Sequence, residues 1–433
     1  MRDFVNKKLI PAVMIVVNTK AIISIKNGMM VVMPFTIIGS VFLLLANPPI
    51  KPLAESINNA GLTPFLNQAF NASFGIMAFF AVMGIASSYV KESGFDGQPA
   101  GMIALSGFIL LMLPEVMTVD GVVIGNVINR EWVGGKGMVL AIIVGLITGA
   151  VYSWFLKKDI RIKLPESVPP AVASSFTALI PAAVIISFFT FIYAICLVAG
   201  SSSAFDLIYI AIQIPLQNMT DSFGGVLLMG FLIPFLWFFG IHGSSIVSGV
   251  LSPVLVANAL INQSIIDSGL PLTIANGGRI VTQQFLDQFM TTTGAGMTMG
   301  VAIFMVAFAR AQEYKTLGRL SIGPAFFNIN EPILFATPIV MNPFMAIPFF
   351  LTPMLSGTIT YFALKTGLVP LFSGVLVPWT TPPIISGLLV GGWQAAILQF
   401  VVLAMSFFMY YPFISKMDSM AYQTEQESNT EEK

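Results

Sequence analysis

Long apolar runs alternate with short polar breaks along most of the chain, and this pattern predicts a set of membrane-spanning helices. A helix needs about 20 residues to cross the hydrocarbon core of a bilayer. In the first half of the chain the runs have this length and cover about 23–46, 72–90, 99–114, 136–156 and 175–199. The Gly/Asn/Val stretch at 115–135 between two of these runs predicts a small hairpin.

The second half of the chain is more interrupted. Its predicted apolar runs cover about 224–240, a further run to 260, then 289–309, 344–364, 367–377 and 391–412. The polar stretch 261–288 and the proline-interrupted stretch 321–345 separate them. Broken helices occur at membrane depth only where the backbone lines a cavity or is buried in protein. The number of crossings after residue 240 therefore stays open.

Residues 205–222 are too polar for an ordinary span and predict an amphipathic helix along the membrane interface. We therefore expect four parts: an N-terminal half at 1–204, a linker at 205–222, a C-terminal half at 223–417 and a cytoplasmic tail at 418–433. The polar composition of the tail predicts disorder.

Composition narrows the class of protein. Of the 433 residues, 56% are hydrophobic and 9% are charged, and the mean hydropathy is +0.86. Soluble domains carry roughly a quarter charged residues. Lys+Arg and Asp+Glu number 20 each, so no basic surface exists to neutralise phosphates. These figures exclude a soluble enzyme, a disordered chain and a nucleic-acid binder, and they predict an all-α polytopic membrane protein.

The distribution of basic residues predicts the topology. The densest basic cluster lies at 157–163, and further basic residues lie near the N-terminus and at 310–319. Cytoplasmic loops carry an excess of Lys and Arg. We therefore expect the N-terminus and the 157–163 loop to be cytoplasmic. The single cysteine, Cys196, lies in an apolar run and is expected to be a packing residue.

The strongest chemical candidate is Glu331, in the sequence NINEPILF at 328–335. A carboxylate between apolar runs normally faces a cavity or a partner, because ionised groups are costly in hydrocarbon. It could accept two hydroxyl hydrogen bonds from a sugar, with Asn330 beside it. The alternative is ordinary helix-start chemistry before Pro332.

Two further motifs could contact a polar substrate. His242, the only histidine, could orient a hydroxyl, or it could simply end a helix. Trp379, in the sequence WTTP at 379–382, could stack on a sugar ring while Thr380 hydrogen-bonds it, or it could belong to an interfacial aromatic belt. The Gly-rich stretch around Lys136 and Gly137 resembles a phosphate cradle in composition only.

The chain lacks a nucleophile paired with a base, a metal-ligand set and a cofactor motif, so we expect no catalytic residue, metal or cofactor of its own. The residues alone thus indicate a transporter of a neutral polar substrate.

The sequences IHG at 241–243, NEP at 330–332 and WTTP at 379–382 resemble the enzyme IIC membrane component of the bacterial phosphoenolpyruvate-dependent sugar phosphotransferase system. The resemblance is strongest to its lactose/cellobiose/diacetylchitobiose branch and runs from about residue 22 to 417. The stretches 26–40, 164–181 and 238–254 support it. Ala336 departs from the pattern, in which a glycine is expected.

The resemblance implies a homodimer with about ten spans and two re-entrant hairpins per protomer, with both termini on the cytoplasmic side of the bacterial cytoplasmic membrane. The N-terminal half would form the dimer contact and the C-terminal half would hold the sugar. A disaccharide of the cellobiose, diacetylchitobiose or lactose class would be carried inward and phosphorylated by a separate phospho-IIB protein, with IIA upstream.

The resemblance also implies the roles of individual residues. Glu331 would bind the sugar near the hydroxyl that is phosphorylated, with His242 beside it. Trp379 would stack on a ring, Asn330 would support Glu331, and Lys136 and Gly137 would line the site. The alternatives are an ion-coupled secondary sugar transporter, for which Glu331 alone is a thin set of acids, and a membrane receptor or scaffold that transports nothing.

Overall fold

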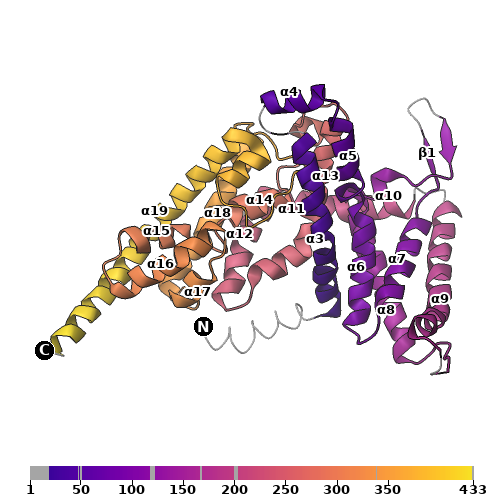
Figure 1. Ribbon diagram of the computed structural model, residues 1–433, viewed down its shortest axis with the longest axis horizontal. Coiled ribbons are helices and arrows are strands. Elements are labelled where there is room, and N and C mark those ends of the chain that lie inside the picture. The colour runs from indigo at the N-terminus through magenta and orange to yellow at the C-terminus, as the bar shows by residue number, and fades with distance from the viewer. Residues whose placement is uncertain are drawn as a thin grey trace. The chain divides into compact units, whose positions relative to one another are not determined.

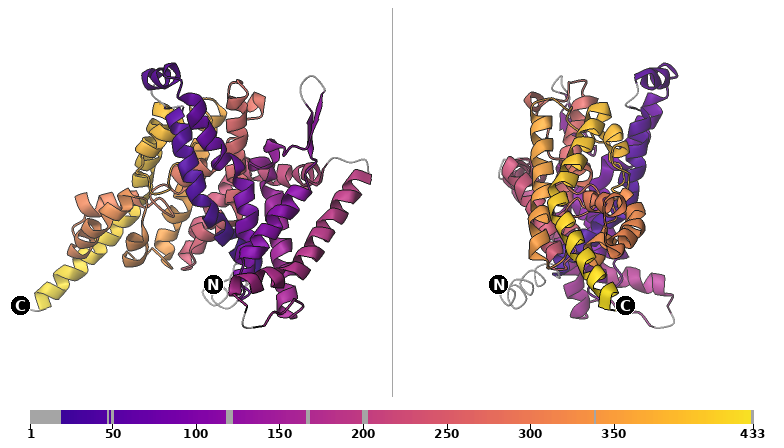
Figure 2. Two further views of the ribbon diagram at one scale, coloured as in Figure 1. Left: turned by 45° about the vertical axis from the view of Figure 1, so that its right-hand side comes forward. Right: turned by 90° about the vertical axis from the view of Figure 1, so that its left-hand side faces the viewer.

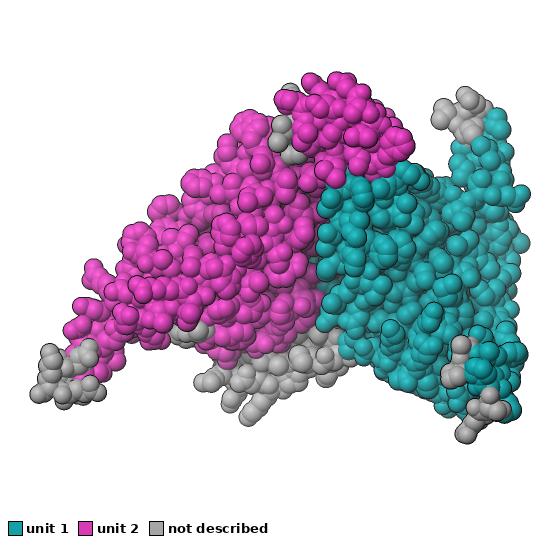
Figure 3. Space-filling view, viewed as in Figure 1, with its two compact units in different colours: residues 1–42, 67–218, 249–260 teal, residues 43–66, 219–248, 261–433 magenta. Residues whose placement is uncertain are grey.

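Contacts within the chain divide the protein into two compact units (Figure 3). The computed structural model describes residues 19–46, 48, 51–117, 122–165, 168–198, 203–337 and 339–431. Unit 1 comprises residues 1–42, 67–218 and 249–260, and unit 2 comprises 43–66, 219–248 and 261–433. The chain thus passes between the units several times. The predicted division at residues 204 and 223 stays a prediction.

The first part of the chain is helical apart from one hairpin (Figure 1). Its helices are α3 (Lys20–Ala46), α4 (Lys51–Asn59), α5 (Thr63–Asn71), α6 (Met77–Lys91), α7 (Gln98–Leu110), α8 (Met138–Lys157), α9 (Pro170–Val198), α10 (Ala204–Ile208) and α11 (Ile214–Thr220). Strands β1 (Glu115–Met117) and β2 (Val123–Gly125) pair antiparallel, with Val116 opposite Ile124. The hairpin predicted within 115–135 is therefore confirmed.

The second part contains long helices and several short ones. They are α12 (Phe223–Phe238), α13 (Gly243–Asp267), α14 (Gln283–Phe285), α15 (Met299–Ala307), α16 (Gln312–Phe326), α17 (Glu331–Ala336), α18 (Pro343–Lys365) and α19 (Ile385–Glu431). Non-helical dihedral angles at Gly391 and Gly392 kink α19.

The helices confirm the predicted class of a polytopic α-helical membrane protein. Among the described residues, seven helices are long and apolar enough to cross a membrane, or eight when α10–α11 and α12 count as one span bent by 73°. The predicted linker at 205–222 is helical, and a five-residue π-helix, Tyr209–Gln213, joins α10 to α11. The expected ten spans, the two re-entrant hairpins and the interfacial position of the linker stay predictions.

Two predictions were wrong. The expected continuous span at 289–309 is broken: a π-helix, Leu286–Met290, is followed by turns at 291–298, and α15 begins only at Met299. The expected disorder of the tail is also wrong, because α19 continues to Glu431. Figure 2 shows α19, in yellow, beside α15 and α16 of the same unit.

Unit 1 is held by close helix packing. A Cβ atom added at Gly28 of α3 would lie 2.6 Å from the backbone nitrogen of Ile85 in α6. One added at Gly84 would lie 2.7 Å from the carbonyl oxygen of Gly28. Small residues let helix backbones approach in this way, which gives dispersion contacts where the hydrophobic effect is absent.

The loop after α8 carries the basic cluster at 157–163. Asp159 adopts a left-handed backbone conformation with φ of 56° and pairs with Arg161 at 2.8 Å and with Lys163. Hydrogen bonds from Lys163 and Arg161 lower the pKa of the Asp159 carboxyl. The acid therefore stays ionised and neutralises part of this cluster.

Unit 2 contains a long segment without helix, residues 366–384, between α18 and α19. Carboxamide side chains contact the backbone of this segment and of the first turn of α19. We call this set the carboxamide ladder; it consists of Asn262, Gln263, Gln284, Gln288, Asn328 and Gln399. Each of these side chains is at most 5% exposed. Because an amide both donates and accepts without carrying charge, it can satisfy buried backbone N–H and C=O groups that no helix pairs.

Candidate functional site

The corner between α16 and α17 brings the predicted Glu331 motif together. The N–H of Asn328 bonds the carbonyl of Ala325, and the N–H of Ile329 bonds that of Pro324, both at 3.0 Å. This pair of bonds is the Schellman pattern that ends a helix, with Asn328 in the left-handed region at φ of 64°. α17 begins three residues later, at Glu331.

A tight turn at residues 291–298 lies against this corner. Asn330 is 2% exposed, and its Nδ2 donates to the carbonyl of Ala295 at 2.7 Å and to Oγ1 of Thr298 at 2.9 Å. Gly294 has φ of 89°, and a Cβ there would lie 2.2 Å from the Asn330 carboxamide. The TGAGMT stretch at 293–298 therefore packs closely against Asn330, and this packing depends on left-handed glycine.

Asn328 connects this corner to the Trp379 segment. Its Nδ2 donates to the carbonyls of Trp379 at 2.5 Å and Thr381 at 3.0 Å. Its Oδ1 accepts the N–H of Thr293 at 2.6 Å. Three segments that are distant in sequence therefore meet at one buried carboxamide.

Glu331 itself is half-buried at the first residue of α17, and Pro332 follows it. No hydrogen bond or ion pair of its side chain occurs within the described ranges. The carboxylate does not cap its own helix, and Asn330 makes no side-chain cap there either. Both carboxylate oxygens can therefore accept hydroxyl hydrogen bonds, as a sugar-binding role requires.

His242 is the N-cap of α13. Its Nδ1 accepts the N–H of Ser245 at 3.1 Å, so in the neutral imidazole the proton lies on Nε2. The ring lies 4.3 Å from that of Trp237, centroid to centroid, and Trp237 also contacts Phe335 of α17 at 6.1 Å. The helix-end interpretation of His242 is thus correct in geometry, and it leaves an exposed Nε2–H donor that can meet a substrate oxygen.

Trp379 and Thr380 lie in the turn before α19. The Trp379 side chain is 50% exposed, and Thr380 is half-buried. No aromatic ring pair involves Trp379 in the described part of the chain. The Trp379 side chain is therefore half accessible, and the backbone carbonyl of this residue is held by Asn328.

Lys136 and Gly137 lie in unit 1. The Lys136 amine pairs with Glu131 and lies 5.9 Å from the ring centroid of Tyr209. A Cβ at Gly137 would lie 1.8 Å from the carbonyl oxygen of Trp132, so only glycine fits there. Gln213 donates to the carbonyl of Gly135 at 2.9 Å and fixes the loop that carries both residues.

Unit 2 thus joins the Glu331 and Trp379 segments through Asn328, and it places His242 on α13 beside Trp237. Sequence reasoning missed Asn328 and Trp237 as contributors. Asn328 lies in the NIN sequence two residues before Asn330, and the repeated asparagine in an otherwise apolar stretch was the available signal.

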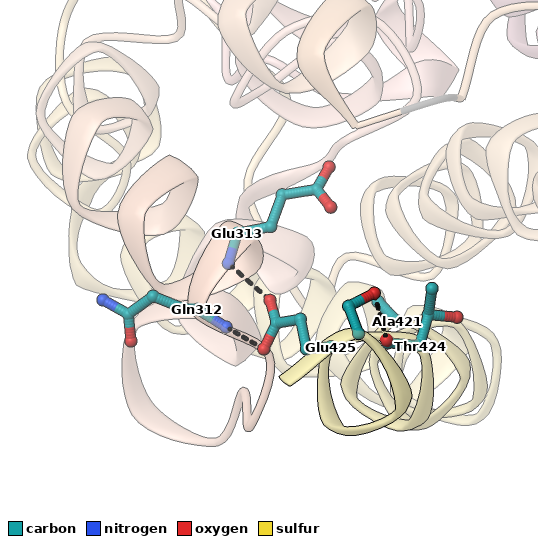
Figure 4. Close-up of a pocket in the computed structure, with 6 residues that line it drawn as sticks. Gln312, Glu313, Ala421, Thr424 and Glu425 are labelled. Carbon is teal, nitrogen blue, oxygen red and sulfur yellow. Dashed lines mark hydrogen bonds between the residues drawn. The ribbon is translucent and has the colours of Figure 1, made fainter. Parts of the chain in front are cut away.

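The far end of α16 is tied to α19 by carboxylates. Asp418 accepts the N–H groups of Arg310 and Ala311 at 2.9 and 3.0 Å. Glu425 accepts those of Gln312 and Glu313 at 3.0 and 3.2 Å, as Figure 4 shows. A small pocket beside Glu425 is lined by α16 and α19 and includes none of the predicted site residues. The C-terminal end of α16 leads to Asn328. The contacts of Asp418 and Glu425 therefore hold the other end of the same helix.

Comparison with known proteins identifies the family of this chain. The family "Phosphotransferase system, EIIC" matches residues 26–353, which is most of the chain. The chain belongs to this EIIC family.

Several proteins are similar to this EIIC chain over nearly its whole length. The cellobiose-specific EIIC component of Geobacillus stearothermophilus is 35% identical, with 94% of this chain and 92% of that protein covered. The lichenan permease IIC component of Bacillus subtilis (strain 168) is 33% identical, with 98% and 95% covered.

A solved structure shares the fold of this EIIC chain. The crystal structure of the IIC component of the N,N'-diacetylchitobiose-specific phosphotransferase system has a TM-score of 0.92 and 34% sequence identity, with 98% of this chain and 99% of that chain covered. The resemblance drawn from IHG, NEP and WTTP is therefore confirmed. The protein is a polytopic membrane transporter and a sugar permease of the phosphotransferase system.

Proposed function

We propose that this EIIC permease binds an extracellular disaccharide of the cellobiose, diacetylchitobiose or lactose class and carries it inward for phosphorylation. One observation carries the proposal: Asn328 joins the segment of Glu331, whose carboxylate has no hydrogen bond or ion pair within the described residues, to the segment of the half-exposed Trp379. A sugar presents hydroxyls to the first and an apolar ring face to the second. The relatives described above, which are named for cellobiose, lichenan and diacetylchitobiose, support the class.

The proposed roles follow from the chemistry of each side chain. Glu331 accepts hydrogen bonds from two neighbouring hydroxyls, one of them the hydroxyl to be phosphorylated. His242 donates Nε2–H to a sugar oxygen. Trp379 stacks on one ring and Thr380 bonds a hydroxyl beside it, while Asn330 holds the Glu331 segment against its turn. Lys136 and Gly137 are proposed to line the sugar site as well.

The phosphate comes from outside this chain. A separate phospho-IIB protein, supplied by IIA, is the proposed donor, and no phosphoryl-carrying residue is assigned to this chain. We further propose a homodimer that uses the N-terminal half, in a bacterial cytoplasmic membrane with both termini cytoplasmic. The Lys157–Lys163 cluster supports this orientation, because basic loops stay on the cytoplasmic side.

Calorimetry on the purified permease tests the proposal. We expect saturable binding of at least one sugar from a panel of cellobiose, lactose and diacetylchitobiose. Glu331→Gln should weaken that binding at least about a hundredfold, because it removes two charge-assisted hydrogen bonds. Glu115→Gln, an exposed acid on the hairpin, is the matched control and should bind as the wild type does.

Two outcomes would contradict the proposal. Absence of binding across the panel would reject the substrate class, and an unchanged affinity in Glu331→Gln would reject the site. Uptake into liposomes driven by an ion gradient, without any phosphorylating proteins, would instead favour the ion-coupled transporter.

A further inference from the structure

We propose that Asn328 is a positioning residue for the sugar: its carboxamide fixes the Trp379 loop against the Glu331 corner so that indole and carboxylate can hold one ligand together. This inference rests on the proposed function, because it assigns Trp379 and Glu331 to the sugar. Asn328 would itself contact neither the sugar nor the phosphate, and it would act through the two segments that it joins.

The hydrogen bonds of Asn328 use nearly all the capacity of its side chain. Both hydrogens of Nδ2 are directed to carbonyls of the Trp379 loop, at 2.5 and 3.0 Å, and Oδ1 accepts from Thr293 at 2.6 Å. The side chain is 5% exposed. Buried polar groups that lose a partner are costly, so these bonds hold their segments in one arrangement.

Trp379 depends on its backbone for its position. Its side chain is 50% exposed and makes no aromatic ring contact within the described residues, so no neighbouring ring orients the indole. Asn328 donates hydrogen bonds to the backbone carbonyls of Trp379 and Thr381, and these two bonds fix the turn that carries the indole. A stacking residue that is poorly packed needs this kind of support, because an unfixed indole loses conformational entropy on binding.

A simpler role for Asn328 is that of a helix terminator. It occupies the left-handed position that ends α16, and asparagine tolerates φ of 64° there. Glycine is preferred at such a position, so Asn328→Gly keeps the helix end and removes only the carboxamide. The two roles therefore predict opposite results for this one substitution.

The experiment measures disaccharide affinity by calorimetry on the full chain. We expect Asn328→Gly to weaken binding about tenfold, and the same substitution in a Trp379→Ala background to change affinity by less than about threefold. This non-additivity is the readout that a general loss of structure would not produce. Asn126→Gly is the matched control, because Asn126 is exposed on the hairpin and has φ of 59°; its affinity should equal that of the wild type.

A second variant guards against a folding defect. Asn328→Asp keeps the size, the left-handed tolerance and the acceptor for Thr293, and it loses both donors to the Trp379 loop. It should also weaken binding. Wild-type affinity in Asn328→Gly, or an equal loss with and without Trp379, would overturn the inference while the proposed function stood. A wild-type protein that binds no sugar in the panel would overturn both.

Discussion

Both units must pair the N–H and C=O groups of a backbone that lies in an apolar environment, and they do so in different ways. In unit 1, backbone groups are paired mainly within long helices, and glycines such as Gly28 and Gly84 allow close packing. In unit 2, the chain leaves helical structure at 291–298 and 366–384, and buried carboxamides complete its hydrogen bonds. The second solution needs more specific side chains, and it places non-helical backbone next to the candidate sugar site. The difference is that unit 1 relies on close helix packing, whereas unit 2 relies on specific buried side chains.

The largest loss of stability is expected at Gln399, whose carboxamide makes four hydrogen bonds. Gln399 accepts the N–H groups of Ile384 and Gly387 and donates to the carbonyl of Gln288 and to Oγ of Ser386, all at 2.6–2.8 Å. Gln399→Leu should lower the free energy of unfolding by about 3 kcal/mol or more, because four groups, three of them buried, lose their partner. Thermal unfolding in detergent measures it.

Gln423→Leu is the control for that substitution, since Gln423 is exposed on the same helix. A loss in Gln399→Leu no larger than in the control would show that the carboxamide ladder is dispensable. The contrast between the units would then disappear.

A smaller effect is expected from crowding unit 1. Gly84→Val places side-chain atoms against the backbone of α3 at Gly28 and should destabilise the protein by about 1–3 kcal/mol. Gly323→Ala in α16, where nothing lies within 4 Å of the added Cβ, should not destabilise it. Thermal unfolding of both variants tests whether α3 and α6 pack as closely as described; equal melting temperatures would contradict it.

The smallest effect is expected at the end of α19. Glu425→Gln keeps one acceptor but removes the charge beside the first N–H groups of α16, and it should cost about 0.5–1 kcal/mol at low salt. Added salt should shrink the difference from the wild type, because the interaction is partly exposed. Glu427→Gln, an exposed neighbour, is the control. A salt-independent loss would indicate that charge plays no part in this contact.

Much of unit 1 was predictable, because its signals are local. Apolar runs of about 20 residues mark the spans, and the Gly/Asn-rich interval at 115–135 marks the hairpin. The motifs around Glu331, His242 and Trp379 also identified the family, since short polar sequences stand out in an apolar chain.

The errors have a common physical cause, which is that distant contacts decide the local structure. The turns at 291–298 were assigned to a continuous span because Thr, Gly and Ala do not interrupt an apolar average, whereas Asn328 and Asn330 stabilise the turn from more than 30 residues away. The tail was predicted to be disordered because its composition is polar. It is helical to Glu431, and Asp418 and Glu425 anchor it to the start of α16.

The carboxamide ladder also consists of side chains that can react with water. Asparagine and glutamine are among the thermolabile residues, because their amides hydrolyse to carboxylic acids. At Gln399 this change would remove the donors to Gln288 and Ser386 and place an acid among buried oxygen atoms. In unit 1, the buried Gln213 makes a contact of this kind with the carbonyl of Gly135. Hydrolysis of this one amide would therefore disturb the segment that precedes α19, which carries the candidate residue Trp379.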